Sequence, residues 1–270
     1  MIKTISNIHL NLMDKRKYFI IFLVLVQSIF IFAEDTFEYA ASSGDTLYVW
    51  AETGLNIRAY GNQEAEILGV IPFGNAIIFV DHDNSGRIEE VPFYQHSAEI
   101  SIINGIDFKC LAYSQKGRWI KIKFGSLVGF VFNGYTSRYK PIKGETSILH
   151  LIEHNVNLIS TTEHYDEKQD CSSKYMHYNK GISIIGNLCK SGNWTYVFPN
   201  MTLEEAILFS RKNIEYQFKY ILPEGNVCLY ETVLDKESNV VSIKFTNNTN
   251  WFMQITYTSD AIIISESVWC

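Results

Sequence analysis

The stretch Gly-Leu-Asn-Ile-Arg-Ala at residues 54–59 decides how the first half of this chain folds. A short apolar run, Leu-Tyr-Val-Trp at residues 47–50, comes just before it. In residues 55–58 apolar and polar side chains alternate, which is typical of a strand with one buried face. We therefore expect Leu55 and Ile57 to point into a small core.

Two further phrases follow in a fixed order. They read Gly-Arg-Trp-Ile-Lys-Ile-Lys at residues 117–123 and Val-Gly-Phe-Val-Phe-Asn-Gly-Tyr at residues 128–135. Together with residues 54–59, these phrases resemble the bacterial SH3 domain, a small β-barrel common in exported proteins of the bacterial envelope. The resemblance covers residues 47–138 and implies an SH3-like barrel over residues 45–140. Within such a barrel, Gly129 would permit two strands to cross closely.

Residues 81–116 form an insertion relative to a minimal domain of this family. The insertion opens on turn-forming residues at 81–86 and contains an apolar-polar run at residues 98–102. We expect it to hold an extra hairpin.

Residues 145–270 predict an α+β domain with an antiparallel meander sheet. Ser147 is expected to cap a short helix over residues 148–155, and a hairpin is expected to turn at residues 179–181. Thr202 and Glu205 have the spacing of a capping box, which predicts a second helix that ends near residues 211–212. The remaining expected strands are 171–178, 182–189, 194–198, 215–222, 226–233, 239–246, 251–257 and 261–268. The predicted fold class is thus mainly β, a barrel followed by an α+β domain.

The mature chain as a whole also resembles exported bacterial proteins that pair this barrel with an α+β tail. The resemblance rests on Leu-Glu-Glu-Ala at residues 203–206, on Ile-Ser-Glu-Ser at residues 264–267 and on the terminal Cys270. It implies an architecture and no activity for the tail.

Residues 1–33 have the order of a secretory signal peptide. Three basic residues at 15–17 precede an almost wholly apolar run at 18–32, and Ala33 precedes two acidic residues. The apolar run is shorter than the ~20 residues that a spanning helix needs. We expect a periplasmic or secreted protein with no membrane span after cleavage, and an uncleaved N-terminal anchor is the alternative.

The charge of the chain argues against nucleic acid as a partner. The formal net charge is -6, and no basic cluster follows the predicted signal peptide. Nucleic-acid binding needs Lys and Arg side chains against phosphate groups. The sequence predicts no metal site and no cofactor.

Five cysteines lie beyond the predicted signal peptide, and none forms a C-x-x-C pair. If the hairpin at residues 179–181 turns on Lys180, Cys171 faces Cys189 directly, within reach of a disulfide. A second candidate pair is Cys228 with Cys270, because their strands belong to one meander. Cys110 would then be the odd thiol.

Four aromatic side chains are candidates for a ligand-binding groove on the predicted barrel. They are Tyr60, Trp119, Phe130 and Tyr135. SH3-type barrels bind peptides on such surfaces. The alternative is that these rings pack in the core.

Two patterns could carry catalysis, and each has a simpler explanation. Residues 150–154 match the H-x-x-E-H spacing of inverted zinc peptidases, but the expected helix is short. His164 and His177 flank Cys171, but a disulfide is the simpler role for that cysteine. We therefore predict no catalytic residue.

The sequence favours a non-enzymatic envelope protein that binds peptide or peptidoglycan through the barrel. The alternatives are a hydrolase, or an accessory of one, that acts on cell-wall material, and an inhibitor or interaction protein that binds another protein.

Overall fold

The structure is a computed structural model. It describes residues 41–82, 88–94, 100–103, 106–109, 113–144, 146–168, 170–189, 191–221, 228–234, 240–246 and 251–269. The predicted signal peptide, Cys110 and Cys270 lie outside these ranges. Residues 40–270 form one compact unit. Within the described ranges, no helix has both the length and the apolar character needed to cross a membrane.

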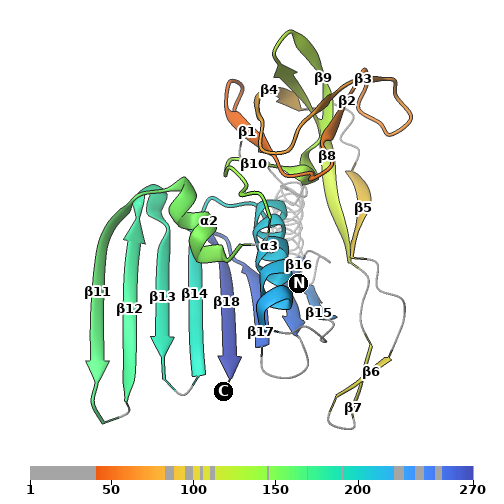
Figure 1. The fold of residues 1–270 in the computed structure, drawn as a ribbon. Helices are drawn as coiled ribbons and strands as arrows, with labels where there is room; N and C mark the ends of the chain where they lie inside the picture. The colour runs from red at the N-terminus through yellow and green to blue at the C-terminus, as the bar shows by residue number, and fades with distance from the viewer. Residues whose placement is uncertain are drawn as a thin grey trace, which may run out of the picture. The chain divides into compact units, whose positions relative to one another are not determined.

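The first sheet is antiparallel and contains eight strands. Their bounds are β1 (Thr46–Val49), β2 (Leu55–Arg58), β3 (Ile67–Ile71), β4 (Ala76–His82), β5 (Ile88–Tyr94), β8 (Tyr113–Phe124), β9 (Leu127–Phe132) and β10 (Thr136–Ser137). The order is β10-β1-β4-β8-β9-β2-β3, and β5 pairs with β8 (Figure 1). This path is open among the described strands, so the predicted closure into an SH3-like barrel is not confirmed.

The core of this sheet contains the side chains that the alternation predicts. Leu55 and Ile57 are buried, as is Ile122 on β8. Gly129 is also placed as expected, because a Cβ added there would lie 2.6 Å from Cγ2 of Ile57 and 2.7 Å from the carbonyl oxygen of Arg58. Strands β2 and β9 cross at a separation that only glycine permits.

The insertion contains the predicted hairpin. Strands β6 (Ile100–Ile103) and β7 (Ile106–Lys109) pair with each other as a separate two-stranded sheet. Strand β5, which lies before them in the chain, pairs antiparallel with the long strand β8.

The second sheet is also antiparallel and contains eight strands, in the order β11-β12-β13-β14-β18-β17-β16-β15. Their bounds are β11 (Leu158–Asp166), β12 (Cys171–Tyr178), β13 (Ser183–Leu188), β14 (Ser191–Pro199), β15 (Cys228–Leu234), β16 (Val240–Thr246), β17 (Trp251–Tyr257) and β18 (Ala261–Trp269). The mainly β, antiparallel fold class is confirmed. Strand β11 was not among the strands expected from the sequence. Both of its faces are exposed, so it lacks the alternation of apolar and polar residues that marks a half-buried strand.

The two helices begin at the predicted caps. The backbone N–H of His150 donates to Oγ of Ser147 at the start of α2 (Ile148–Asn155). At the start of α3 (Leu203–Ile221), the backbone N–H of Glu205 donates to Oγ1 of Thr202, and the carboxylate of Glu205 accepts from the backbone N–H of Thr202. This is the reciprocal arrangement of a capping box.

Helix α3 continues past its predicted end, so the predicted strand at 215–222 is wrong. The apolar spacing of the helix runs on through Ile214, Phe218 and Ile221, and neither Gly nor Pro interrupts it before Pro223. Two basic residues at 211–212 are compatible with a helix end, but they do not force one.

Helix α3 is shared by the two sheets. It packs on β17 and β18 of the second sheet (Figure 1). The ring of Phe209 on this helix also lies 5.4 Å from the ring of Trp50 and 5.1 Å from that of Tyr139, measured between centroids. A separate fold for residues 45–140 and 145–270 stays a prediction.

Candidate ligand-binding pocket

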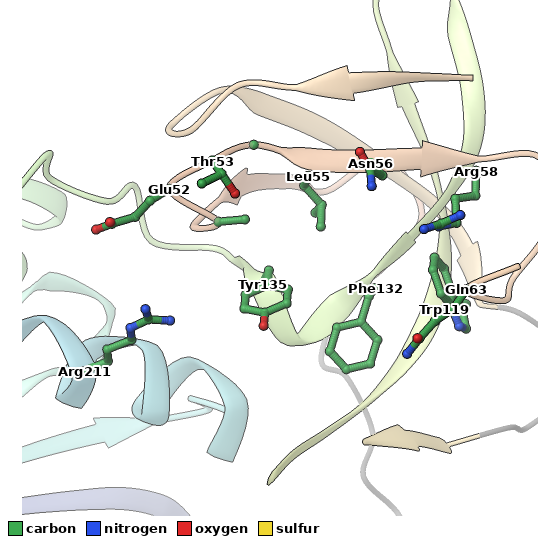
Figure 2. Close-up of a pocket in the computed structure, with 12 residues that line it drawn as sticks. Glu52, Thr53, Leu55, Asn56, Arg58, Gln63, Trp119, Phe132, Tyr135 and Arg211 are labelled. Carbon is green, nitrogen blue, oxygen red and sulfur yellow. The ribbon is translucent and has the colours of Figure 1, made fainter. Parts of the chain in front are cut away.

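A pocket of about 490 Å³ opens where the first sheet meets α3. Its walls come from the β1–β2 loop, β2, β8, the end of β9, the turn after β9 and the middle of α3 (Figure 2). The lining residues are Ala51, Glu52, Thr53, Gly54, Leu55, Asn56, Arg58, Gln63, Trp119, Phe132, Tyr135 and Arg211.

Three aromatic rings form one wall of this pocket. Trp119 comes from β8, Phe132 ends β9, and Tyr135 lies in the short 3-10 turn Asn133–Tyr135. The ring centroids of Trp119 and Phe132 are 6.3 Å apart, and those of Phe132 and Tyr135 are 5.9 Å apart. Both contacts are edge-to-face, a favoured geometry for aromatic pairs. The rings therefore form a continuous apolar surface.

Two glycines hold Phe132 in place. A Cβ added at Gly117 would lie 2.5 Å from Cζ of Phe132, and one added at Gly134 would lie 2.4 Å from its Cε1. Any larger residue at either position would displace the ring. The glycines of the phrases at 117–123 and 128–135 thus shape the aromatic wall.

The indole nitrogen of Trp119 is a buried donor. The residue is only 4% exposed, and its Nε1 has no hydrogen-bond partner within the described residues. Buried indole N–H groups normally have an acceptor, since leaving one unpaired costs free energy. A ligand in the pocket could supply the acceptor.

Charged groups surround the aromatic wall. Arg58 on β2 donates through Nη1 to the carbonyl oxygen of Ala65, at 2.7 Å. This bond fixes the direction of the Arg58 side chain. Arg211 extends from α3 toward the pocket (Figure 2). The two guanidinium groups give the pocket cationic character on both sides of the aromatic wall.

The one acidic residue of the lining, Glu52, is paired. Its carboxylate accepts from the ammonium group of Lys212 on α3, whose side chain is buried. The same ammonium group lies 5.6 Å from the centroid of the Phe73 ring. The pair ties the β1–β2 loop, which forms the pocket rim, to the helix.

The structure brings two of the four predicted aromatic residues together. Trp119 and Tyr135 line the pocket, whereas Tyr60 and Phe130 do not. Tyr60 is 71% exposed and Phe130 is half-buried.

Phe132 and Arg211 line the pocket but were not among the predicted site residues. Phe132 could have been found from the glycines at 117 and 134, which lie in the quoted phrases. Arg211 could not, because only the tertiary fold brings α3 to the first sheet.

The predicted Cys171–Cys189 disulfide is present, with 4.5 Å between the Cα atoms. The register of β12 and β13 is the predicted one, since Ser172 pairs with Leu188 and His177 with Ser183. The side chain of Cys228, together with Cys110 and Cys270, lies outside the described part of the chain. The Cys228–Cys270 pair therefore stays a prediction.

Two histidines of the candidate catalytic patterns contact neighbouring hydroxyl groups. Nδ1 of His150 lies 3.1 Å from Oγ1 of Thr146, and Nδ1 of His177 lies 3.0 Å from Oγ of Ser183. The hydroxyl of Tyr178 donates to Glu153 at 3.5 Å. Among the residues that the structure describes, no three His, Cys, Asp or Glu side chains are grouped to hold a metal ion.

Comparison of the chain with models of known protein families, with curated proteins and with solved structures found no match.

Proposed function

We propose that this chain is an exported, non-enzymatic envelope protein whose pocket binds a peptide, either a protein segment or the peptide part of peptidoglycan. The observation that carries this proposal is the buried Nε1 of Trp119, a donor without a partner in the described structure, beside an aromatic wall. An extended peptide presents carbonyl acceptors at regular intervals. Peptide segments also dock into aromatic-lined grooves on small β-domains.

The charges of the pocket favour a ligand that carries a carboxylate. Arg58 and Arg211 both line it, and guanidinium groups bind carboxylates through paired, charge-assisted hydrogen bonds. The peptides of peptidoglycan contain free carboxylates as well as amide carbonyls. The same chemistry occurs in an acidic protein segment, so both sources must be tested.

Two features support an extracytoplasmic location. Residues 1–33 have the order of a signal peptide, with a basic cluster before an apolar run. The Cys171–Cys189 disulfide is of a kind that persists in oxidising compartments. A peptidoglycan ligand is accessible only from such a compartment.

The test is binding to purified cell-wall sacculi by co-sedimentation, together with calorimetry on a soluble peptidoglycan peptide. Tyr135→Ala removes a half-buried ring from the pocket wall and is expected to weaken both signals about tenfold or more. Trp119→Phe removes the indole donor and keeps an aromatic ring, so it is expected to weaken binding as well. Tyr60→Ala is the matched control, because its exposed ring does not line the pocket.

Two results would overturn the proposal. The first is wild-type protein that neither co-sediments with sacculi nor binds peptidoglycan or acidic peptides. The second is equal loss of binding in Tyr60→Ala and Tyr135→Ala, since that would place the ligand outside the pocket. Binding to acidic peptides without binding to sacculi would support the pocket as a peptide-binding site and identify a protein segment as its ligand.

A further inference from the structure

Strand β11 is a long strand at the end of the second sheet (Figure 1). It has nine residues, Leu158–Asp166, and all but the last are exposed. Within the described part of the chain it pairs with β12 and with no other strand. Its outer edge therefore presents a row of backbone donors and acceptors.

Strand β11 has few of the features that normally keep a sheet edge from pairing. Such edges are usually short, or they contain Lys or Pro, or they are interrupted by bulges. Residues 158–166 include neither Lys nor Pro, and the one irregularity is at the start, between Leu158 and Ser160. The strand also exposes three large apolar side chains, with Leu158 at 53%, Ile159 at 69% and Tyr165 at 56%.

We propose that β11 pairs with β11 of a second copy of this chain, antiparallel and around a two-fold axis at Thr162. A two-fold axis normal to the sheet sets the two copies of β11 antiparallel. The backbone N–H and C=O groups on the edge of one copy then meet the C=O and N–H groups on the same edge of the other. The two second sheets then join into one continuous sheet. This surface is separate from the pocket, so the inference does not depend on the proposed function.

The sequence of β11 is complementary to itself in this register. With Thr162 opposite Thr162, Glu163 lies opposite Thr161, and His164 lies opposite Ser160. Glu163 and His164 thus each meet a hydroxyl group, and Asp166 lies opposite Leu158 at the end of the strand. Ile159 lies near Tyr165 of the second copy, and aromatic–aliphatic pairs across strands are stabilising.

The neighbouring symmetric registers are less favourable. The two-fold axis keeps each side chain on the same face of the sheet in both copies. One residue must therefore lie opposite its own copy at the axis. Centring on Glu163 would place two carboxylates directly opposite each other, which is destabilising. Centring on Thr161 would place Glu163 opposite Ile159. The register at Thr162 avoids both.

The side chains of β11 are held in a way that suits this pairing. The carboxylate of Glu163 accepts from the hydroxyl of Ser172 at 3.0 Å, and the hydroxyl of Tyr165 donates to Asp170 at 2.6 Å. Both partners lie beyond the end of β11 or on β12, on the inner side of the strand. Neither contact involves the backbone groups of its outer edge.

The first experiment measures the mass of the purified mature protein in solution by sedimentation velocity over a range of concentrations, with reductant absent. A dimer whose population rises with concentration is expected. A single species with the mass of the monomer at every concentration would overturn the proposal.

The second experiment locates the axis with Thr162→Cys. Facing positions have Cβ atoms ~4.5–5.5 Å apart, so this variant is expected to form a disulfide-linked dimer under mild oxidation. His164→Cys is the matched control on the same face, because its copies would lie well beyond disulfide reach. A dimer in which Thr162→Cys links no better than His164→Cys would contradict pairing at this strand.

A third variant, Thr162→Lys, places like charges at the axis without altering the core, since Thr162 is exposed. It is expected to raise the dimer dissociation constant several-fold, and salt is expected to reduce the effect. A dimer unaffected by this change would also contradict the proposal. The circular dichroism spectrum of each variant should match the wild type.

Discussion

The side chain of Arg138 forms an ion pair with Glu205, with 2.7 Å between Nη2 and Oε2. Arg138 directly follows β10 of the first sheet, and Glu205 lies in the first turn of α3. Oε1 of the same carboxylate accepts from the backbone N–H of Arg138 at 2.8 Å and from the hydroxyl of Ser137 at 3.0 Å. One buried carboxylate thus caps its own helix and fastens that helix to the first sheet.

Glu205→Ala is expected to destabilise the protein strongly, because it leaves several donors unpaired. Loss of one partner from a buried ion pair costs on the order of 3 kcal/mol. The measurement is the free energy of unfolding from urea titration. Glu64→Ala is the control, since it removes an exposed carboxylate. Equal stability of the two variants would show that the Glu205 contacts do not hold the sheets together.

Ile57→Ala tests the core of the first sheet. Ile57 is fully buried against Gly129, so truncation should leave a cavity and cost about 2–5 kcal/mol. The midpoint of thermal unfolding reports the loss. Tyr60→Ala, at an exposed position, should change stability by no more than about 0.5 kcal/mol. An unchanged midpoint for Ile57→Ala would contradict this core.

Glu204 should make stability depend on pH. Burial raises the pKa of its carboxyl above the usual 4.5, and hydrogen bonds from its own backbone and from Thr202 only partly oppose this. The folded protein therefore holds the proton to higher pH than the unfolded chain does. The free energy of unfolding should fall as the pH rises from 4.5 through the raised pKa of Glu204. Above that pKa the full cost of burying the ionised carboxylate is present.

Glu204→Gln should flatten this pH dependence, because the amide does not ionise. The free energy of unfolding, measured for both proteins from pH 4 to pH 8, gives the comparison. The variant should gain relative stability toward the upper end of the range. A constant difference between the two proteins at every pH would rule out Glu204 as the titrating group.

The Cys171–Cys189 disulfide should stabilise the β12–β13 hairpin. The two residues are 18 positions apart, and closing a loop of that size is worth about 3 kcal/mol in the chain-entropy model. Reductant should lower the unfolding midpoint of the wild type and leave that of a Cys171→Ser, Cys189→Ser double variant unchanged. Peptide mapping without reductant should recover the linked pair. Equal sensitivity of both proteins to reductant would assign the effect to other cysteines.

Export can be checked directly at the N-terminus. Cleavage after Ala33 is expected, since a small residue there ends the apolar run. N-terminal sequencing of the protein from cells should begin at or near Glu34. Recovery of the intact segment 15–33 in the membrane fraction would favour the uncleaved anchor.

Local patterns in the sequence determined much of the secondary structure. The cap at Ser147, the capping box at Thr202 and the turn on Lys180 each depend on residues within a few positions of one another. The turn also set the hairpin register and, with it, the cysteine pair at 171 and 189. Such features are predictable because their energetics are local.

Contacts between distant parts of the chain were decided only by the tertiary structure. The strand β11 and the position of Arg211 in the wall of the pocket have no local signal. Glu205 shows the difference most clearly. Its spacing from Thr202 predicted a cap, but its bond to Arg138 joins residues 67 positions apart. Packing across such separations depends on how whole sheets and helices bury their apolar faces, which a single stretch of sequence does not specify.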